Sequence, residues 1–174
     1  MDDLRLVLPT TAFEQEYRAF IAEFVARGEP ERFYREPEGE FAAFVEQLAR
    51  EARGEGLPEW AVPQTVFWAV RGGRLVGVLK LRHRLNPALE RYGGHIGYFV
   101  RPSARGQGVA TRMLALALSE ARALGLTRVL LTCDLDNLAS ARVMMKNGGV
   151  RDTDGVHPET GLPIARYWIA PAAG

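Results

Sequence analysis

The sequence has little cysteine, little lysine and no excess of charge of either sign. Its 174 residues include a single cysteine, Cys133, so no disulfide can form within the chain. Lysine and arginine number 22 and aspartate and glutamate 21, which gives a net charge of +1 and does not indicate a strongly basic nucleic-acid-binding surface. No apolar run approaches the ~18 residues that a membrane span requires, and the acidic N-terminus lacks the apolar core of a signal peptide. We therefore expect a cytoplasmic protein without nucleic-acid or membrane partners.

The composition is that of an ordinary globular protein. Hydrophobic residues make up 47% of the chain and charged residues 25%, which is enough apolar material for a packed core. The sequence contains no internal repeat and no stretch with the composition of a linker. The length is typical of one domain and short for two, so we expect residues 1–174 to form a single domain.

Hydrophobic periodicity predicts a mixture of strands and helices. Apolar residues at helical spacing predict helices at about 13–25, 41–52, 106–124 and 137–147. Short β-branched, aromatic or apolar runs predict strands at 4–8, 65–70, 75–81, 95–100, 129–133, around Val150, and at 164–169. Arg71-Gly72-Gly73 indicates a hairpin turn. This order predicts an α+β (α/β) fold around a mixed sheet.

One segment carries specific chemistry, a glycine-rich loop between a strand and a long helix. Residues 99–110 run Phe-Val-Arg-Pro-Ser-Ala-Arg-Gly-Gln-Gly-Val-Ala. The start of a helix has N–H groups without partners and a partial positive charge, and Gly106 and Gly108 have no Cβ to keep a phosphate away from the backbone. The spacing is neither that of a Walker A loop nor G-x-G-x-x-G, because Thr111 stands where the last glycine would be. A tight turn that needs glycine for geometry alone is the alternative.

This segment and the residues after it resemble the GNAT superfamily of N-acetyltransferases. Arg105 to Ala110 resembles the R/Q-x-x-G-x-G/A signature of the loop that binds the pyrophosphate of acetyl-CoA in that family. Asn137 to Ser140 resembles the N-x-x-[AS] opening of the next helix, and Lys146 to Gly148 the K-x-G that ends it. The stretch from His95 to Pro102 is most similar to the ribosomal-protein N-terminal acetyltransferase branch. The resemblance implies a mixed, mostly antiparallel sheet of about six to seven strands flanked by about four helices.

The resemblance also implies acetyl-CoA as the co-substrate and suggests the residues that bind it. They lie at the end of the fourth predicted strand, in the glycine-rich loop and in the two helices that follow, and they are Phe99, Val100, Arg105, Gly106, Gln107, Gly108, Val109, Ala110, Thr111, Asn137, Ser140 and Lys146. We expect loop amides to carry most of the phosphate binding, with a charge-assisted contact added by Arg105. A backbone N–H near Phe99 or Val100 would polarise the thioester oxygen. No metal is required, and no metal-ligand spacing occurs in the sequence.

Proton transfer is the step where the sequence departs from the family. Many relatives have a tyrosine as general acid where this chain has Met144, and a phenylalanine where it has Gly149. Tyr98 and Tyr167 are the candidates to replace that acid, or else are packing residues. His95 is the candidate general base, since an unperturbed histidine titrates near pH ~6.5. Its alternative role is that of a hydrogen-bonded strand residue.

These observations predict an N-acetyltransferase in which a primary amine attacks the thioester of acetyl-CoA directly. The sequence does not distinguish a small amine from a protein or peptide N-terminus as the acceptor. Phe33, Tyr34 and Trp60 are predicted in loops that flank the second helix, where they either line an acceptor pocket or pack onto the sheet. The alternative function is a catalytically silent acyl-CoA-binding domain, which the missing tyrosine at Met144 keeps open. The family also suggests a possible homodimer through the C-terminal strands.

Overall fold

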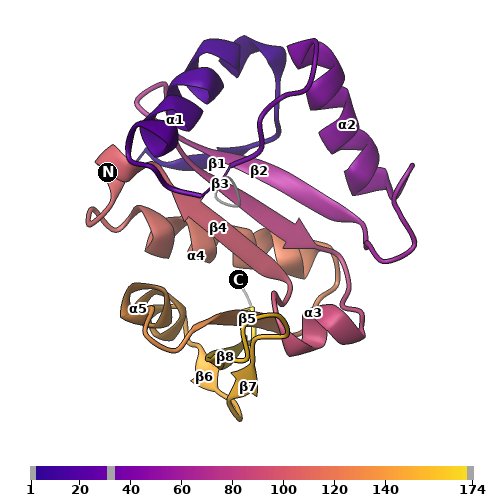
Figure 1. Ribbon diagram of the computed structural model, residues 1–174, viewed down its shortest axis with the longest axis vertical. Coiled ribbons are helices and arrows are strands. Elements are labelled where there is room, and N and C mark those ends of the chain that lie inside the picture. The colour runs from indigo at the N-terminus through magenta and orange to yellow at the C-terminus, as the bar shows by residue number, and fades with distance from the viewer. Residues whose placement is uncertain (1–2, 31–33, 172–174) are drawn as a thin grey trace.

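Two antiparallel sheets form the centre of the protein. The computed structural model describes residues 3–30 and 34–171, so Phe33 lies outside the described residues. The first sheet has the order β1-β2-β3-β4, and these strands are β1 (Arg5–Val7), β2 (Gln64–Arg71), β3 (Arg74–Arg82) and β4 (Ile96–Val100) (Figure 1). The second has the order β5-β8-β6 with β7 also paired to β8, and these strands are β5 (Val129–Asp134), β6 (Val150–Arg151), β7 (Gly155–Val156) and β8 (Pro163–Ile169).

The helices lie close to the predicted ranges. In the described residues they are the 3-10 turns η1 (Thr11–Phe13) and η3 (Pro102–Ala104) and the α-helices α1 (Glu14–Ala26), α2 (Phe41–Arg53), α3 (Pro87–Arg91), α4 (Val109–Ala123) and α5 (Leu138–Lys146). The short helix α3 was not predicted. Its signal is in the sequence, because Asn86 caps it by accepting a hydrogen bond from the N–H of Leu89 and Pro87 occupies its first position.

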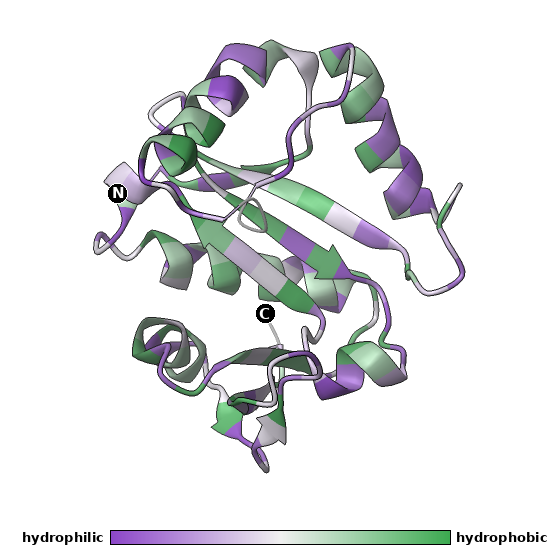
Figure 2. Ribbon diagram, in the orientation of Figure 1, coloured by the Kyte–Doolittle hydropathy of each residue, from purple (hydrophilic) through white to green (hydrophobic). Residues whose placement is uncertain are grey.

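Helices cover both faces of the first sheet. Helices α1 and α2 lie on one face, where their aromatic side chains pack around Trp68, and α4 lies on the other (Figure 1). The α4 face is continuous with the core of the second sheet, which α5 also covers. Figure 2 shows the strands in the middle as largely hydrophobic and the helices as two-sided, which is the pattern from which they were predicted.

The two sheets meet at one point, where β4 begins. The N–H of His95 donates to the carbonyl of Leu130 at 2.7 Å, and the N–H of Leu130 donates to Nδ1 of His95 at 2.9 Å. Gly94 precedes this junction with φ +61°, and a Cβ there would overlap the carbonyl of Leu130. Beyond the junction β4 and β5 are not paired with each other, so the gap between them is closed at His95 and open toward Val100.

The α+β fold is confirmed, and the implied single sheet is divided into two. The described residues contain eight strands, one more than predicted. The predicted strand around Val150 pairs with β8, and the additional strand at Gly155–Val156 pairs with β8 as well. No helix in the described part of the chain is long and apolar enough to cross a membrane.

Candidate active site

A cleft of about 620 Å³ lies at the open end of the gap between β4 and β5. Its size is within the usual range of small-molecule sites, ~300–1,000 Å³. The cleft brings together nearly all of the residues predicted to bind acetyl-CoA, and these are Phe99, Val100, Arg105, Gly106, Gly108, Val109, Ala110, Thr111, Asn137, Ser140 and Lys146. Tyr98 also lines it. These residues come from β4, the glycine-rich loop, α4 and α5, which are the elements that the sequence predicted to be neighbours.

The glycine-rich loop leaves room for a ligand above its backbone. Gly106 and Gly108 have φ values of +75° and +77°, in the left-handed region that favours glycine. No heavy atom lies within 4 Å of the place where a Cβ would stand on either residue. Because Gly108 holds this conformation, α4 begins at Val109 and not at Gly106 as predicted. The N–H groups of its first turn have no partners within the helix and face the cleft end of α4.

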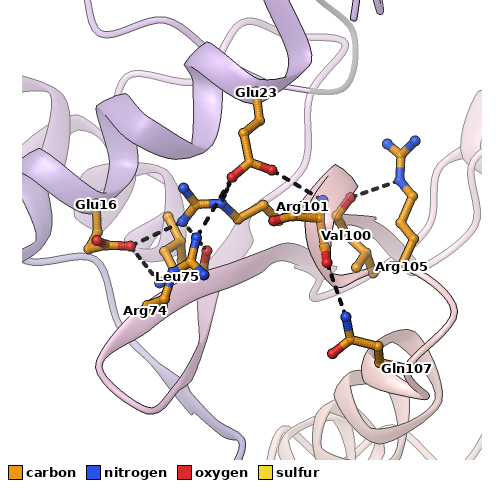
Figure 3. Close-up of polar contacts among 9 residues, drawn as sticks. Glu16, Glu23, Arg74, Leu75, Val100, Arg101, Arg105 and Gln107 are labelled. Carbon is orange, nitrogen blue, oxygen red and sulfur yellow. Dashed lines mark hydrogen bonds and ion pairs between the residues drawn. The ribbon is translucent and has the colours of Figure 1, made fainter. Parts of the chain in front are cut away.

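A buried arginine anchors the start of this loop. Arg101 is 4% exposed, and its guanidinium group contacts Glu16 at 3.1 Å, Glu23 at 2.5 Å and the carbonyl of Leu75 at 3.1 Å (Figure 3). Glu23 also accepts a hydrogen bond from the N–H of Ser103, and its pKa is lowered by the hydrogen bonds from Arg101 and Ser103, although burial opposes the shift. Helix α1 is thereby tied to the loop by charge-assisted hydrogen bonds.

Arg105 is already engaged by a carboxylate. Its two terminal nitrogens pair with both oxygens of Glu29 at 2.8 and 2.7 Å, and its Nε donates to the carbonyl of Val100. The guanidinium group also lies over the ring of Phe24, at 5.5 Å from the centroid. Glu29 lines the cleft, and the hydrogen bond from Arg105 lowers its pKa. No local sequence pattern pointed to Glu29.

The side chain of Gln107 does not line the cleft. Its Oε1 accepts from Arg71 at 2.6 Å. Its Nε2 donates to the carbonyl of Ser103 at 3.0 Å, the dashed line from Gln107 in Figure 3. The predicted contribution of Gln107 is thus limited to its backbone.

Helix α5 forms the opposite wall of the cleft. Asn137 caps this helix, since its Oδ1 accepts from the N–H of Ser140 at 3.1 Å. Arg142, which was not predicted, lines the cleft together with Ala139, Val143 and Lys146. Spacings of three to four residues place side chains on one helix face, so the four-residue spacing from Lys146 was the available signal for Arg142.

Tyr98 is the titratable side chain best placed for proton donation into the cleft. Its hydroxyl group lies 2.7 Å from Oγ of Ser140, which joins β4 to α5. Burial raises its pKa to about 12, against the opposing effect of this hydrogen bond. Tyr98 is therefore protonated at neutral pH and retains the proton that a general acid needs.

The other two predicted catalytic residues lie away from the cleft. His95 is 6% exposed, and burial, with the charge of Arg82, lowers its pKa to about 4. Since its Nδ1 accepts from Leu130, the neutral ring carries its proton on Nε2. These contacts favour the strand-histidine role that the sequence left open. Tyr167 is buried in β8 and lines a separate cavity behind α5.

Met144 does not offer a substitute for the family's tyrosine. Its side chain is 1% exposed and belongs to the core that α4 and α5 share. Cys133 is also buried in this core, and burial raises the pKa of its thiol to about 11, so it is not a nucleophile.

A family comparison identifies the domain. The family model described as an acetyltransferase (GNAT) domain matches residues 5–150, which is most of the chain. The chain belongs to the GNAT acetyltransferase family. This confirms the predicted family and the predicted class of enzyme, an acetyl-CoA-dependent acetyltransferase.

Solved structures of GNAT proteins share the fold over nearly the whole chain. The microcin self-immunity acetyltransferase MccE, solved with acetyl-CoA and AMP, has a TM-score of 0.72 at 15% identity, covering 98% of this chain and 93% of that one. The Salmonella typhimurium yncA, described as a putative acetyltransferase and solved with acetyl-CoA, has a TM-score of 0.64 at 15% identity, with coverage of 98% and 95%.

For a third GNAT structure the acceptor is known. It is an acetyl transferase from Salmonella typhimurium that modifies the N-terminal serine of a 50S ribosomal subunit protein, and it has a TM-score of 0.67 at 17% identity, with coverage of 96% and 94%. No curated protein matches the chain.

Proposed function

We propose that this GNAT protein binds acetyl-CoA in the cleft between β4 and β5 and transfers the acetyl group to a primary amine by direct attack. The observation that carries the proposal is the open space above Gly106 and Gly108 at the N-terminus of α4. An anionic group in that space meets N–H groups without helical partners and the positive end of a helix of 15 residues. Two of the GNAT structures with the same fold contain acetyl-CoA.

The residues of the cleft fit the different parts of acetyl-CoA. The amides of Gly108 to Thr111 would hold the pyrophosphate, while Lys146 and Arg142 supply positive charge on the α5 side. Phe99, Val100, Asn137 and Ser140 line the route toward the closed end of the gap, where the acyl arm would lie. The thioester supplies the acetyl group and a thiolate leaving group, and the chain holds it in place for attack.

The register of β4 supports Val100 over Phe99 as the donor to the thioester oxygen. The N–H of Arg101 donates to the carbonyl of Val76 in β3. Alternate residues of a strand direct their N–H groups to the same side. The N–H of Phe99 therefore points toward β3, as that of Arg101 does, and the N–H of Val100 points the other way, toward the cleft. A backbone N–H fixed at that position stabilises the oxyanion that forms as the amine attacks.

Tyr98 is our proposal for the general acid. Tyr98 lines the cleft from β4, and its hydroxyl group is hydrogen-bonded to that of Ser140 in α5. Tyr98 would donate the proton that the family's tyrosine, absent at Met144, donates in many relatives. His95 is not proposed as the base. Its Nδ1 already accepts a hydrogen bond at the junction of the sheets, and burial there lowers its pKa to about 4. The ammonium group would lose one proton to water before it attacks. The second proton, lost from the nitrogen after attack, would return to Tyr98 through solvent and replace the proton that Tyr98 gives to the leaving thiolate.

The experiment that tests this proposal combines binding and turnover. Calorimetry measures the affinity for acetyl-CoA, and thiol release with mass spectrometry of the products measures transfer to a panel of small amines and N-terminal peptides. We expect Tyr98→Phe to lower kcat by about tenfold, below the usual ~10²–10⁴ of general acid catalysis, because a thiol with a pKa near ~8.5 leaves readily without an acid. The affinity for acetyl-CoA should be unchanged.

Tyr167→Phe is the control, because it removes the hydroxyl group of a buried strand tyrosine that lies outside the cleft. Equal kcat values for Tyr98→Phe and the unmodified enzyme would remove Tyr98 from the reaction. Acetyl-CoA binding without transfer to any amine would instead support the silent acyl-CoA-binding domain. The single domain over 1–174 and the homodimer through the C-terminal strands stay predictions.

A further inference from the structure

The face of β4 opposite the α4 core has its own small cavity. It encloses about 20 Å³, room for one water-sized group, and lies between the first sheet and helices α1 and α2. Phe99 lines both this cavity and the acetyl-CoA cleft, so the two spaces meet at the reactive end of β4. If acetyl-CoA occupies the cleft from the side of α4 and α5, an amine reaches the thioester from this second face.

The cavity holds a lysine without a partner. Lys80 of β3 lines it, and this lysine forms no hydrogen bond or ion pair with any residue that the structure describes. Burial lowers its pKa, and the neighbouring guanidinium groups of Arg82 and Arg35 lower it further. No sequence motif singles out Lys80, because it stands in an otherwise apolar stretch of the strand.

Glu51, the carboxylate whose charge acts on Lys80, already binds two other side chains. Glu51 binds Arg35 through one oxygen at 2.8 Å and Gln64 through the other at 3.2 Å. Arg82 donates to the carbonyls of Gly93 and Gly94 and makes no ion pair among the described residues. Among the residues that the structure describes, three cations therefore share this region with one carboxylate, and all three side chains are partly buried. A buried charge without a counter-ion is costly.

Space for a ligand lies directly beside Lys80. In the register of the sheet, Lys80 is opposite Gly97 of β4. No heavy atom lies within 4 Å of the position of a Cβ on Gly97. An acceptor can therefore lie over Gly97 and extend along β4 to Phe99, with its anionic group beside Lys80 and outside the enclosed cavity, which has room only for a water-sized group.

We propose that the acceptor amine carries an anionic group, a carboxylate or a phosphate, and that Lys80 binds this group on the α1 and α2 face of β4. This inference rests on the proposed acetyltransferase function and deepens it. Binding an anion there compensates the surplus charge of Lys80 and Arg82. The same positive charge disfavours a bare ammonium group, so simple alkylamines are poor acceptors.

Matched pairs of acceptors test the inference. Glycine and β-alanine are compared with their primary amides, and O-phosphoethanolamine with ethanolamine, so that the carboxylate and phosphate arms distinguish the two anions. We expect kcat/KM to be about 10–100-fold higher for the anionic member in at least one arm, the value of a hydrogen bond to a charged group. Lys80→Met should remove that preference, and Lys80→Arg, which keeps the charge, should retain most of it.

The acetyl-CoA affinity of each variant, measured by calorimetry, shows that the variant is folded and that its cleft is intact. Equal kcat/KM for both members of every pair would overturn the inference while leaving the acetyltransferase function in place. A preference for the anionic member that survives in Lys80→Met would also overturn it. If no amine of either kind is acetylated although acetyl-CoA binds, the proposed function fails and this inference falls with it.

Discussion

The two ends of the gap between β4 and β5 are built in different ways. At the closed end, His95 and Leu130 exchange hydrogen bonds and Gly94 lets the two chains approach closely. At the open end, the strands part and the glycine-rich loop turns from β4 into α4. The closed end is made of buried, neutral contacts, and the open end of backbone amides and charged side chains. We infer that the closed end fixes the separation of the strands and the open end binds the ligand.

The largest expected effect is the loss of acetyl-CoA affinity caused by a substitution at Gly108, at the open end. We expect Gly108→Ala to weaken acetyl-CoA binding by about 10–100-fold, because a Cβ would fill the space where a phosphate oxygen approaches the amides and would cost charge-assisted hydrogen bonds. Calorimetry measures the affinity. The left-handed φ of +77° adds a cost in stability of roughly 1–2 kcal/mol for alanine.

Gly125→Ala separates the two effects. Gly125 ends α4 with a similar φ of +83°, also has open space around the position of a Cβ, and lies outside the cleft. It should lose similar stability and keep full acetyl-CoA affinity. If both variants bind acetyl-CoA as the unmodified protein does, the loop is a structural turn and the comparison between the two ends fails.

The contacts of His95 at the closed end should make the free energy of unfolding depend on pH. Burial holds the pKa of His95 at about 4, below its unfolded value near ~6.5. The unfolded chain therefore binds the proton first, and the stability that neutral His95 contributes is present above pH ~6.5 and is lost as the pH falls toward 4. We expect a loss of about 3 kcal/mol over this window, measured by urea unfolding at a series of pH values.

His95→Asn is the variant that isolates this effect. The Oδ1 of asparagine can accept the hydrogen bond from the N–H of Leu130 and does not titrate. The difference in stability between the variant and the unmodified protein should shrink as the pH falls from 7 to 5, while kcat at neutral pH changes little. A constant difference across this range would show that His95 is not held neutral by folding. A large loss of kcat in a well-folded variant would show that His95 takes part in the reaction.

The sequence predicted those parts of the molecule that depend on local pattern. Periodicity located the long helices and the central strands, and the glycine spacing located the cleft through Gly106 and Gly108. The partners of the loop arginines were not predictable in this way. Arg101 meets Glu16 and Glu23, and Arg105 meets Glu29, across 76 to 85 residues of sequence.

Such contacts follow from the packing of α1 against the loop, which no local spacing encodes. The roles of His95 and Lys80 have the same origin. A histidine at the start of a strand is chemically suited to be a base until the N–H that occupies its Nδ1 is known. A lysine in a strand is ordinarily exposed at its tip, and only the positions of Glu51, Arg35 and Arg82 show that this one lacks a counter-ion.

The smallest expected effect concerns Arg105, and it sharpens the account of the open end. If backbone amides carry the phosphate binding, Arg105 acts mainly by neutralising Glu29, whose carboxylate lines the cleft. Arg105→Ala should then weaken acetyl-CoA binding by up to about tenfold, because an uncompensated carboxylate repels the phosphates. Glu29→Gln in the same chain should restore most of the affinity, since the repulsion disappears with the charge. The two single variants and the double variant form a cycle that calorimetry can complete. If the double variant binds as weakly as Arg105→Ala alone, the guanidinium group contacts the phosphate itself, and the open end depends on a side chain as well as on its amides.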